Sequence, residues 1–341
     1  MHRTTGQSNH LVRRVTRRRF LGATAALAAG VARSVVAARE AERPGDRAGH
    51  DERLMLRPGT PRARVVLVRS PHVVQDATVH HTVLGEMFDA AMRSLVGTRT
   101  TADAWRSILV PQDVVGIKFN RSGQAALGTT DAVADTLLHS LADAGWPSDR
   151  IVCIEAPQVA ARHGTRSPLA GYDPAPADFG SGSDHFAAVL GQVTALINVP
   201  FLKTHNIAGM TCCLKNLSHG LIKHPARYHR NGCSPYIGDI VAARPIRGKL
   251  RLCVVDALRV VHDGGPEARP DGTTDEGVII ASFDAVAADS VAVSALSSAR
   301  RRHHLPPVAR LPEDIGYLAA AHRRGLGIAV REGIELIEPR V

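Results

Sequence analysis

The sequence predicts a single α/β domain over residues 63–341, with a mainly parallel sheet flanked by helices and some long irregular loops. The first observation is a set of short β-branched runs that are almost continuously apolar, as expected of strands buried on both faces. The second is that helix-like segments separate these runs. The strands are predicted at residues 64–69, 114–119, 150–155, 195–200, 250–256 and 277–282.

Helices are expected where apolar positions recur with the helical period. Two other stretches lack regular periodicity: residues 156–183 are rich in Pro, Gly, Ser and Ala, and residues 262–276 read HDGGPEARPDGTTDE. Long loops of this kind in a compact domain either cover a binding site or are disordered. The helices are predicted at residues 79–96, 130–144, 184–192, 208–222, 284–299 and 313–324.

Residues 1–38 are predicted to be a twin-arginine export signal, with a basic N-terminal arm as the alternative. A basic region leads into an apolar run of small residues, and TRRRFL, residues 16–21, resembles the twin-arginine motif. The apolar run over residues 20–32 has 13 residues, fewer than the about 20 that cross a bilayer as a helix, so no permanent membrane anchor is expected. Residues 39–62 are predicted to be a linker. The expected partner is the twin-arginine export machinery, and the expected location is periplasmic or extracytoplasmic.

The composition argues against nucleic acid as a partner. The net charge is +10, but residues 1–37 contribute seven arginines and no acid, and subtracting these seven charges leaves +3. Aromatic residues make up 4% of the chain, so stacked bases would find few platforms. Five cysteines without regular spacing do not form a disulfide framework.

Polar side chains follow the predicted strands at their carboxyl ends, where open α/β sheets bind ligands. Because these ends lie together in parallel strands, the polar groups are expected to converge on one crevice, although any single one could be a plain strand end. They are Lys118 and Asn120, then Glu155, Lys203 and His205, Asp256, Asp284 and Asp289.

Lysine is rare in this chain. Of 42 Lys and Arg residues only five are lysines, and three of these lie between residues 202 and 224. An ammonium is a compact charge that can lose its proton when buried, so Lys118, Lys203 and Lys215 are expected to hold an anion. Residues 185–238 contain no Asp or Glu, which favours a carboxylate or phosphate ligand; a solvated basic face paired with distant acids explains the same pattern.

The helix predicted at residues 208–222 would begin just beyond a strand end. Asn206 is its expected N-cap, and the free N–H groups of its first turn would form an anion site. Its apolar face consists of residues spaced by four, three and four: Met210, Leu214, Leu217 and Leu221.

The sequence contains candidate ligands for two kinds of metal site. Cys212 and Cys213 are adjacent and match neither a structural zinc spacing nor a ferredoxin-type iron–sulfur run, so a soft metal or redox role has little support. Carboxylates suit Mg, Mn or Fe better, and the candidate ligands are Glu155, Asp256 and Asp289 with the imidazole of His205. Asp284 is expected to cap the helix at residues 284–299 instead.

Five segments occur in an order that resembles domain-of-unknown-function family 362: VGIKFN, LINVPFLKTH, MTCCLKNLSHGLI, VVDALRVVHDGGP and GVIIASFDAVAADSVA. The resemblance covers most of residues 64–338 and implies a common α/β domain, with no established activity. Some family members carry iron–sulfur ferredoxin modules and some carry export signals. The resemblance singles out, without assigning roles, Lys118, Asn120, Lys203, His205, Lys215, Asn216, Asp256, Gly265, Pro266 and Asp289.

The combined interpretation is an exported enzyme, or enzyme-like domain, that binds a small anionic ligand, with a divalent metal ion as the candidate cofactor. His205 is the expected general acid/base, with Lys118 and Asp256 as further catalytic candidates. Two alternatives stay open: a redox or electron-transfer-associated protein, and a non-catalytic binding or assembly factor in the envelope. The expected ligand-binding residues are Lys203, Lys215, Asn120, Asn216 and Gly265.

Overall fold

The computed structural model describes residues 62–341, so the predicted export signal and nearly all of the predicted linker lie outside the described residues. A nine-stranded sheet forms the centre, in the order β13-β1-β12-β11-β8-β4-β5, with β9 beside β11 and β10 beside β9. Its strands are β1 (Ala63–Arg69), β4 (Val115–Lys118), β5 (Ile151–Ile154), β8 (Ala195–Asn198), β9 (Phe201–His205), β10 (Gly209–Thr211), β11 (Leu250–Val261), β12 (Thr273–Ser282) and β13 (Ile334–Ile337).

The sheet is mainly parallel, which confirms the predicted fold class. β11, β8, β4 and β5 run parallel to one another, as do β13 with β1 and β9 with β11. The exceptions are β12, which is antiparallel to both β1 and β11, and the β9–β10 hairpin. All six predicted strands are present, with ends that differ by a few residues; β9, β10 and β13 were not predicted.

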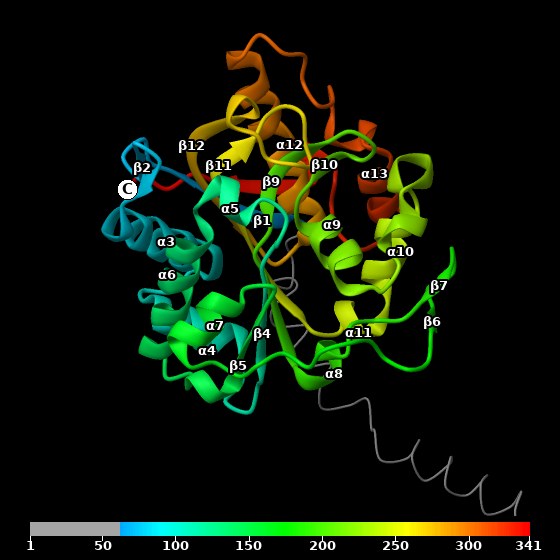
Figure 1. Cartoon of the computed structure of the whole chain (residues 1–341). Coiled ribbons are helices and arrows are strands. Elements are labelled where there is room, and N and C mark those ends of the chain that lie inside the picture. The colour runs from blue at the N-terminus through cyan, green and yellow to red at the C-terminus, as the bar shows by residue number, and fades with distance from the viewer. Residues whose placement is uncertain (1–61) are drawn as a thin grey trace, which may run out of the picture. The chain divides into compact units, whose positions relative to one another are not determined.

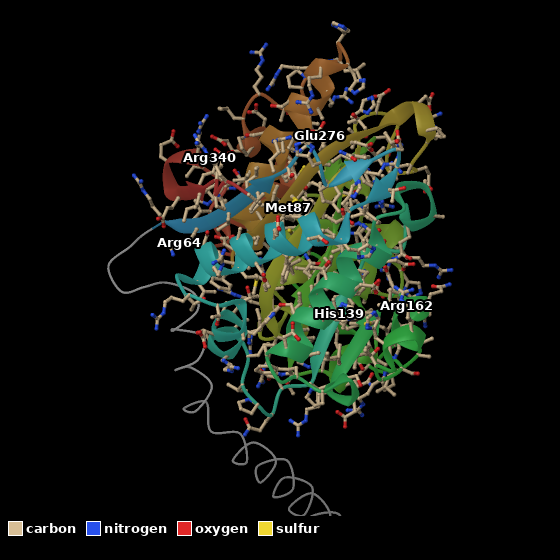
Figure 2. The ribbon with its side chains drawn as sticks, turned by 90° about the vertical axis from the view of Figure 1, so that its left-hand side faces the viewer. Arg64, Met87, His139, Arg162, Glu276 and Arg340 are labelled. Carbon is tan, nitrogen blue, oxygen red and sulfur yellow. The ribbon has the colours of Figure 1, made fainter. Side chains whose placement is uncertain are left out.

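Helices cover both faces of the sheet (Figure 1). One face packs against α3 (His81–Val96), α4 (Thr101–Ile108), α6 (Thr130–Asp143) and α7 (Pro157–His163). Figure 2 turns this layer toward the viewer, with Met87 of α3, His139 of α6 and Arg162 of α7 labelled. The other face packs against α8 (Val189–Gln192), α9 (Cys213–Ser218), α10 (Tyr236–Ala242), α11 (Arg244–Arg247), α12 (Ala285–Arg302) and α13 (Gly316–Arg323).

Alternation along each strand explains why the strand sequences are continuously apolar. In β1, Val65 and Leu67 belong to the core under α12, whereas Val66 and Val68 belong to the core under α3. Successive side chains of a strand point to opposite faces, so a strand covered on both faces buries every residue in turn.

Neighbouring strands of the sheet end at different levels, and a cavity lies beyond the shorter strands. β4 and β5 end at Lys118 and Ile154, whereas β11 continues to Val261. Along the first part of β11 the neighbour is β8, and from Asp256 onward it is β9. The pairing of β8 with β4 continues one residue beyond β8, because the N–H of Val199 donates to the carbonyl of Lys118 at 2.8 Å. After β8 the chain continues beside β11 as β9, beyond the end of β4. The carboxyl ends of β4 and β5 are therefore not covered by β9.

The predicted helix at residues 208–222 was wrong in its first half. Gly209–Thr211 forms β10, which pairs with β9, and α9 begins at Cys213, so Asn206 is not its N-cap. Gly209 has φ +81, a left-handed conformation that starts the hairpin and suits glycine. The predicted apolar face is nevertheless buried, because the side chains of Met210, Leu214, Leu217 and Leu221 are fully covered.

The helix predicted at residues 184–192 is helical only over its last four residues, because Ser183–Asp184 forms β7 and pairs with β6 (Ala177–Asp178). The loop predicted at residues 262–276 is shorter, since β12 begins at Thr273. The predicted helices at residues 79–96, 130–144, 284–299 and 313–324 are confirmed as α3, α6, α12 and α13. Asp284 caps α12 as predicted: its carboxylate accepts from the N–H groups of Val286 at 2.8 Å and Ala287 at 2.9 Å.

The remaining elements are short. No helix between residues 62 and 341 is both long and apolar enough to cross a membrane.

A second small two-stranded sheet pairs β2 (Val74–Gln75) with β3 (Thr78–Val79). Besides α5 (Gln124–Leu127), the connections contain 3₁₀ turns at Ser148–Arg150, His219–Leu221, Pro225–Tyr228, Arg230–Cys233, Pro270–Gly272, Pro312–Asp314 and Arg331–Gly333.

Candidate functional site

A cavity of about 630 Å³ lies where β4, β5 and β9 end, beside α9. Six of the residues singled out from the sequence for ligand binding or catalysis line it, together with the metal candidate Glu155. Of the eight strand-end groups expected to converge, five line the cavity, whereas Asp256, Asp284 and Asp289 do not. The lining residues are Lys118, Asn120, Arg121, Ser122, Gly123, Glu155, Lys203, His205, Thr211, Lys215, Asn216, His219, Gly220, His229, Pro266 and Glu267.

Lys118 is fully buried at the end of β4, and its ammonium has no unused proton. Its Nζ donates to the carbonyl of Phe119 at 2.6 Å, to Glu155 Oε2 at 2.9 Å and to Asn216 Oδ1 at 3.1 Å. Burial lowers the pKa of Lys118, and the carboxylate of Glu155 acts in the opposite direction. With three acceptors for its three protons, Lys118 has no N–H left to donate to a ligand.

Glu155 fastens the loop after β4 to the end of β5. Its Oε2 accepts from the Arg121 backbone N–H at 2.9 Å as well as from Lys118, and its own carbonyl accepts from Gln124 Nε2 at 3.0 Å. Its φ is +65, a left-handed conformation that a residue with a side chain rarely adopts. The surrounding hydrogen bonds hold this strained backbone in place, as is common at functional sites.

Asn216 of α9 connects Lys118 to the sheet. Its amide Nδ2 donates to Asn198 Oδ1 at 2.8 Å, and Asn198 Nδ2 in turn donates to the carbonyl of Cys213 at 3.1 Å. Both amides are at least nine-tenths buried. Glu155, Lys118, Asn216 and Asn198 thus form one continuous chain of hydrogen bonds, which fixes α9 against β4 and β8.

Lys203 and Lys215 differ from Lys118 because each has protons to spare. Lys203 Nζ donates to the carbonyl and the hydroxyl of Ser122, at 2.8 and 3.2 Å, which leaves one N–H. Lys215 Nζ has one partner, His229 Nε2 at 3.2 Å. Burial lowers the pKa of Lys203 to about 8, against the opposing effect of Glu267, and burial also lowers the pKa of Lys215.

His205 is held as a neutral hydrogen-bond donor. Its Nδ1 accepts from the backbone N–H groups of Ile207 at 3.1 Å and Ala208 at 3.2 Å, so the ring proton is on Nε2. Burial and then the nearby Lys215 lower its pKa to about 3. A ring with Nδ1 occupied and Nε2 already protonated cannot accept a proton readily, and this geometry favours a donor over the expected general acid/base.

Two further polar groups at the cavity have no partner among the described residues. The hydroxyl of Thr211 and the Nε2 of His219 are buried without a hydrogen bond. Buried polar atoms are nearly always paired in folded proteins, so each unpaired one needs an explanation. A ligand in the cavity would supply one.

The other predicted site residues lie away from the cavity lining. Asp256 accepts from Thr129 Oγ1 at 2.5 Å and from the N–H of Leu258 at 3.2 Å, and burial raises its pKa to about 6. Gly265 packs against the backbone of Thr204, and its N–H donates to Thr204 Oγ1 at 3.0 Å. Gly265 therefore positions its neighbours Pro266 and Glu267, which do line the cavity.

The three carboxylates proposed as one metal site have separate environments. Glu155 bonds to Lys118, Asp256 bonds to Thr129, and Asp289 caps α9 by accepting from the N–H groups of Cys213 at 2.7 Å and Leu214 at 3.2 Å. Within residues 62–341 they do not come within ligand distance of one another as a group.

The adjacent cysteines are buried beneath the site. The sulfur atoms of Cys212 and Cys213 are 4.0 Å apart, and both residues are fully covered. Burial raises the pKa of Cys212 to about 12 and raises that of Cys213. Because the thiolate is the reactive form, this geometry gives little support to a redox role for the pair.

Sequence reasoning left several lining residues unassigned: Arg121, Ser122, Thr211, His219, His229 and Glu267. A signal was present for the two histidines, since both lie in the acid-free stretch of residues 185–238. The others follow strands or turns whose course around the cavity could not be read from local pattern.

The comparisons with known proteins are consistent with the segment pattern. The family model described as Domain of unknown function (DUF362) matches residues 115–294, more than half of the chain. Every residue that lines the cavity falls inside the matched range. No curated protein matches the chain.

Proposed function

The chain belongs to the family described as Domain of unknown function (DUF362), and since that description names no activity, we propose a function from the site itself: the cavity binds a small anion that carries a carboxylate or phosphate group. The observation that carries the proposal is the set of unused donors in one cavity. Lys203 has one N–H to spare, Lys215 has two, and Thr211 has an unpaired hydroxyl. The neutral His205 adds its Nε2–H.

The charges around the cavity support an anion. Lys118, Lys203, Lys215 and Arg121 line it against only two acids, Glu155 and Glu267, and one of those acids is bonded to Lys118. Charges of one sign in a partly desolvated cleft attract ligands of the opposite sign strongly. An anion would therefore offset the repulsion among the buried ammonium groups and accept the unused protons of Lys203 and Lys215.

Lys203 is the group that suits an enzyme-like role. With a pKa of about 8 it exists in both protonation states near neutral pH, which is the property needed for proton transfer. His205, with its ring proton fixed on Nε2, would donate a hydrogen bond to an oxygen of the ligand. In this proposal Lys203 exchanges a proton with the ligand while Lys215 holds its negative charge.

The test is calorimetric titration of the full-length chain with inorganic phosphate and with malonate over pH 6 to 10. Since the ammonium form of Lys203 binds the anion, Kd should rise about tenfold per pH unit above pH 8. Lys203→Arg should remove this rise, because arginine stays charged, and Lys203→Met should weaken binding at every pH. Lys223→Met, which removes an exposed lysine outside the cavity, is the matched control. Equal affinity in the Lys203→Met and Lys223→Met variants would sink the proposal.

We also propose that the chain is exported by the twin-arginine route. The support is the motif at residues 16–21 and the apolar run after it. The site would then act in the periplasm or another extracytoplasmic space.

A further inference from the structure

A second set of candidate metal ligands, separate from the carboxylates, lies beside the cavity, with two histidines in the cavity lining. One ligand atom from each of His219, His229 and Cys233 lies within 4.8 Å of the other two. We propose that these three residues bind a divalent transition metal ion of the zinc class. His219 begins the first 3₁₀ turn after α9, Cys233 ends the third, and His229 lies between the second and the third, so a single segment of the chain builds the site.

The hydrogen bonds of His229 leave its ring ready to bind a metal. Its Nδ1 lies 3.2 Å from the carbonyl of Pro225, which can only accept, so Nδ1 carries the ring proton. Nε2 then carries the lone pair of the ring, which accepts from Lys215 Nζ at 3.2 Å. Donation from the second ring nitrogen to a backbone carbonyl is the usual way in which proteins orient a metal-binding imidazole.

His219 is oriented in the same sense by a different partner. The hydroxyl of Ser218 donates to the carbonyl of Lys215 at 3.3 Å, so it accepts from His219 Nδ1 at 3.1 Å. The lone pair of His219 therefore lies on Nε2, and this atom is buried without a partner. Burial lowers the pKa of His219 to about 2, so the ring stays neutral, as a metal ligand must be.

Cys233 completes the set from a constrained turn. Asn231, Gly232 and Cys233 all have positive φ, of 52, 62 and 64, and the Cys233 side chain is fully covered. Burial raises the pKa of its thiol, while nearby Lys215 acts in the opposite direction. Metal binding would release the thiol proton to solvent, and the resulting thiolate would bind the ion.

The ligand types indicate which ions fit. Two imidazoles and one thiolate suit zinc, copper or cobalt, whereas magnesium and calcium prefer oxygen. Three protein ligands leave the fourth position of a tetrahedral ion for another group. Because His219 and His229 line the cavity, that position would face it, and here the inference rests on the proposed function: the anion would take the fourth position.

Replacement of Lys215 should strengthen metal binding, which a misfolded variant would not do. Its ammonium lies 3.2 Å from His229 Nε2, so it competes with a metal for that lone pair and repels the ion. Lys215→Met should therefore tighten metal binding by about tenfold or more, a shift of at least ~1.4 kcal/mol. The same change should weaken binding of inorganic phosphate to the metal-free protein.

The experiment is a titration of cobalt(II) into the full-length chain, purified without a polyhistidine tag and free of added phosphate. We expect one ion per chain, a visible spectrum typical of four-coordinate cobalt and a near-ultraviolet thiolate-to-cobalt band. Cys233→Ala should remove that band, and His219→Ala and His229→Ala should each weaken binding by about tenfold or more. Circular dichroism checks that each variant is folded.

Cys212→Ala and Cys213→Ala are the controls, because those thiols form a second cluster with Asp289. A thiolate band that persists in Cys233→Ala but disappears in either control would overturn the proposal, as would no band at all in the parent. Failure of the two proposals is distinguishable. If cobalt binds as expected but Lys215→Met leaves phosphate affinity unchanged, the metal site stands and the anion site does not.

Discussion

Asp289 has no exposed surface, and two backbone N–H groups at the start of α9 donate to its carboxylate. Burial raises its pKa from 3.8 to about 7. The folded protein therefore holds this proton more tightly than the unfolded chain does. The stabilising contribution of Asp289 is complete below about pH 4 and is lost as pH rises through 7.

This residue gives a prediction about stability. Asparagine does not titrate, so the unfolding free energy of the parent should fall relative to that of Asp289→Asn between pH 4 and pH 7. One pKa unit corresponds to about 1.4 kcal/mol, so the change should exceed about 1 kcal/mol. Urea unfolding at each pH measures it, with the exposed Asp271→Asn as the control variant. A difference between parent and Asp289→Asn that stays constant over this range would contradict the assignment.

At this scale the sequence indicates which residues matter better than what they do. The scarcity of lysine drew attention to Lys118, Lys203 and Lys215, and all three line the cavity. Their difference in role depends on how many acceptors surround each ammonium, which is a property of the packed structure. The same holds for His205, because its tautomer is set by the backbone of the turn that follows it.

At the scale of elements, the loop between β11 and β12 is held against β9 by the close approach of Gly265 to Thr204. A Cβ at position 265 would clash with the carbonyl oxygen of Thr204, and that backbone is fixed by the sheet. The loop must therefore shift to admit any side chain. Pro266 and Glu267 would move with it, out of the cavity wall.

Gly265→Ala should accordingly lower the unfolding free energy by about 1–3 kcal/mol and weaken phosphate binding. The matched control is Gly85→Ala in α3, where a Cβ meets nothing within 4 Å. That variant should be more stable than the parent by about 0.5–1 kcal/mol, since alanine favours helices. Thermal unfolding and calorimetry check both; if the two variants behave alike, the close approach is not what positions the loop.

Residues 208–222, predicted as one helix, show which contacts a local sequence pattern does not reveal. The spacing of Met210, Leu214, Leu217 and Leu221 fits a helix, yet hydrogen bonds to β9 extend residues 209–211. The cap of α9 comes from Asp289, 76 positions from Cys213 along the chain. Asp284, by contrast, caps the helix immediately after it and was predicted correctly, because that contact is local.

At the scale of the whole molecule, the sheet and its two helical layers follow from hydrophobic pattern. All six predicted strands have buried residues on both faces, and this is why their sequences do not alternate. The order of the strands and the step from β8 to β9 depend on pairings between distant segments. The cavity exists because of that step, so its lining could be predicted only in part.

The proposed export by the twin-arginine route would act on the whole chain. The double variant Arg17→Lys/Arg18→Lys should stay in the cytoplasm of an expressing bacterial host, whereas the parent should reach the periplasm. Cell fractionation and the intact mass of the exported form, shortened at its N-terminus, measure this. Arg13→Lys/Arg14→Lys alters an arginine pair outside the motif and should be exported like the parent. Equal export of both double variants would exclude the twin-arginine route.

The hydrogen-bond chain from Glu155 through Lys118 and Asn216 to Asn198 has a consequence for redesign. Each hydrogen bond joins two of the four side chains, so replacing one residue would leave a buried polar group of its partner without a hydrogen bond. Ligand preference should therefore be altered at positions outside these four hydrogen-bonded residues, such as Lys203 or Thr211. If this pocket is designed into another protein, all four hydrogen-bonded residues should be introduced together.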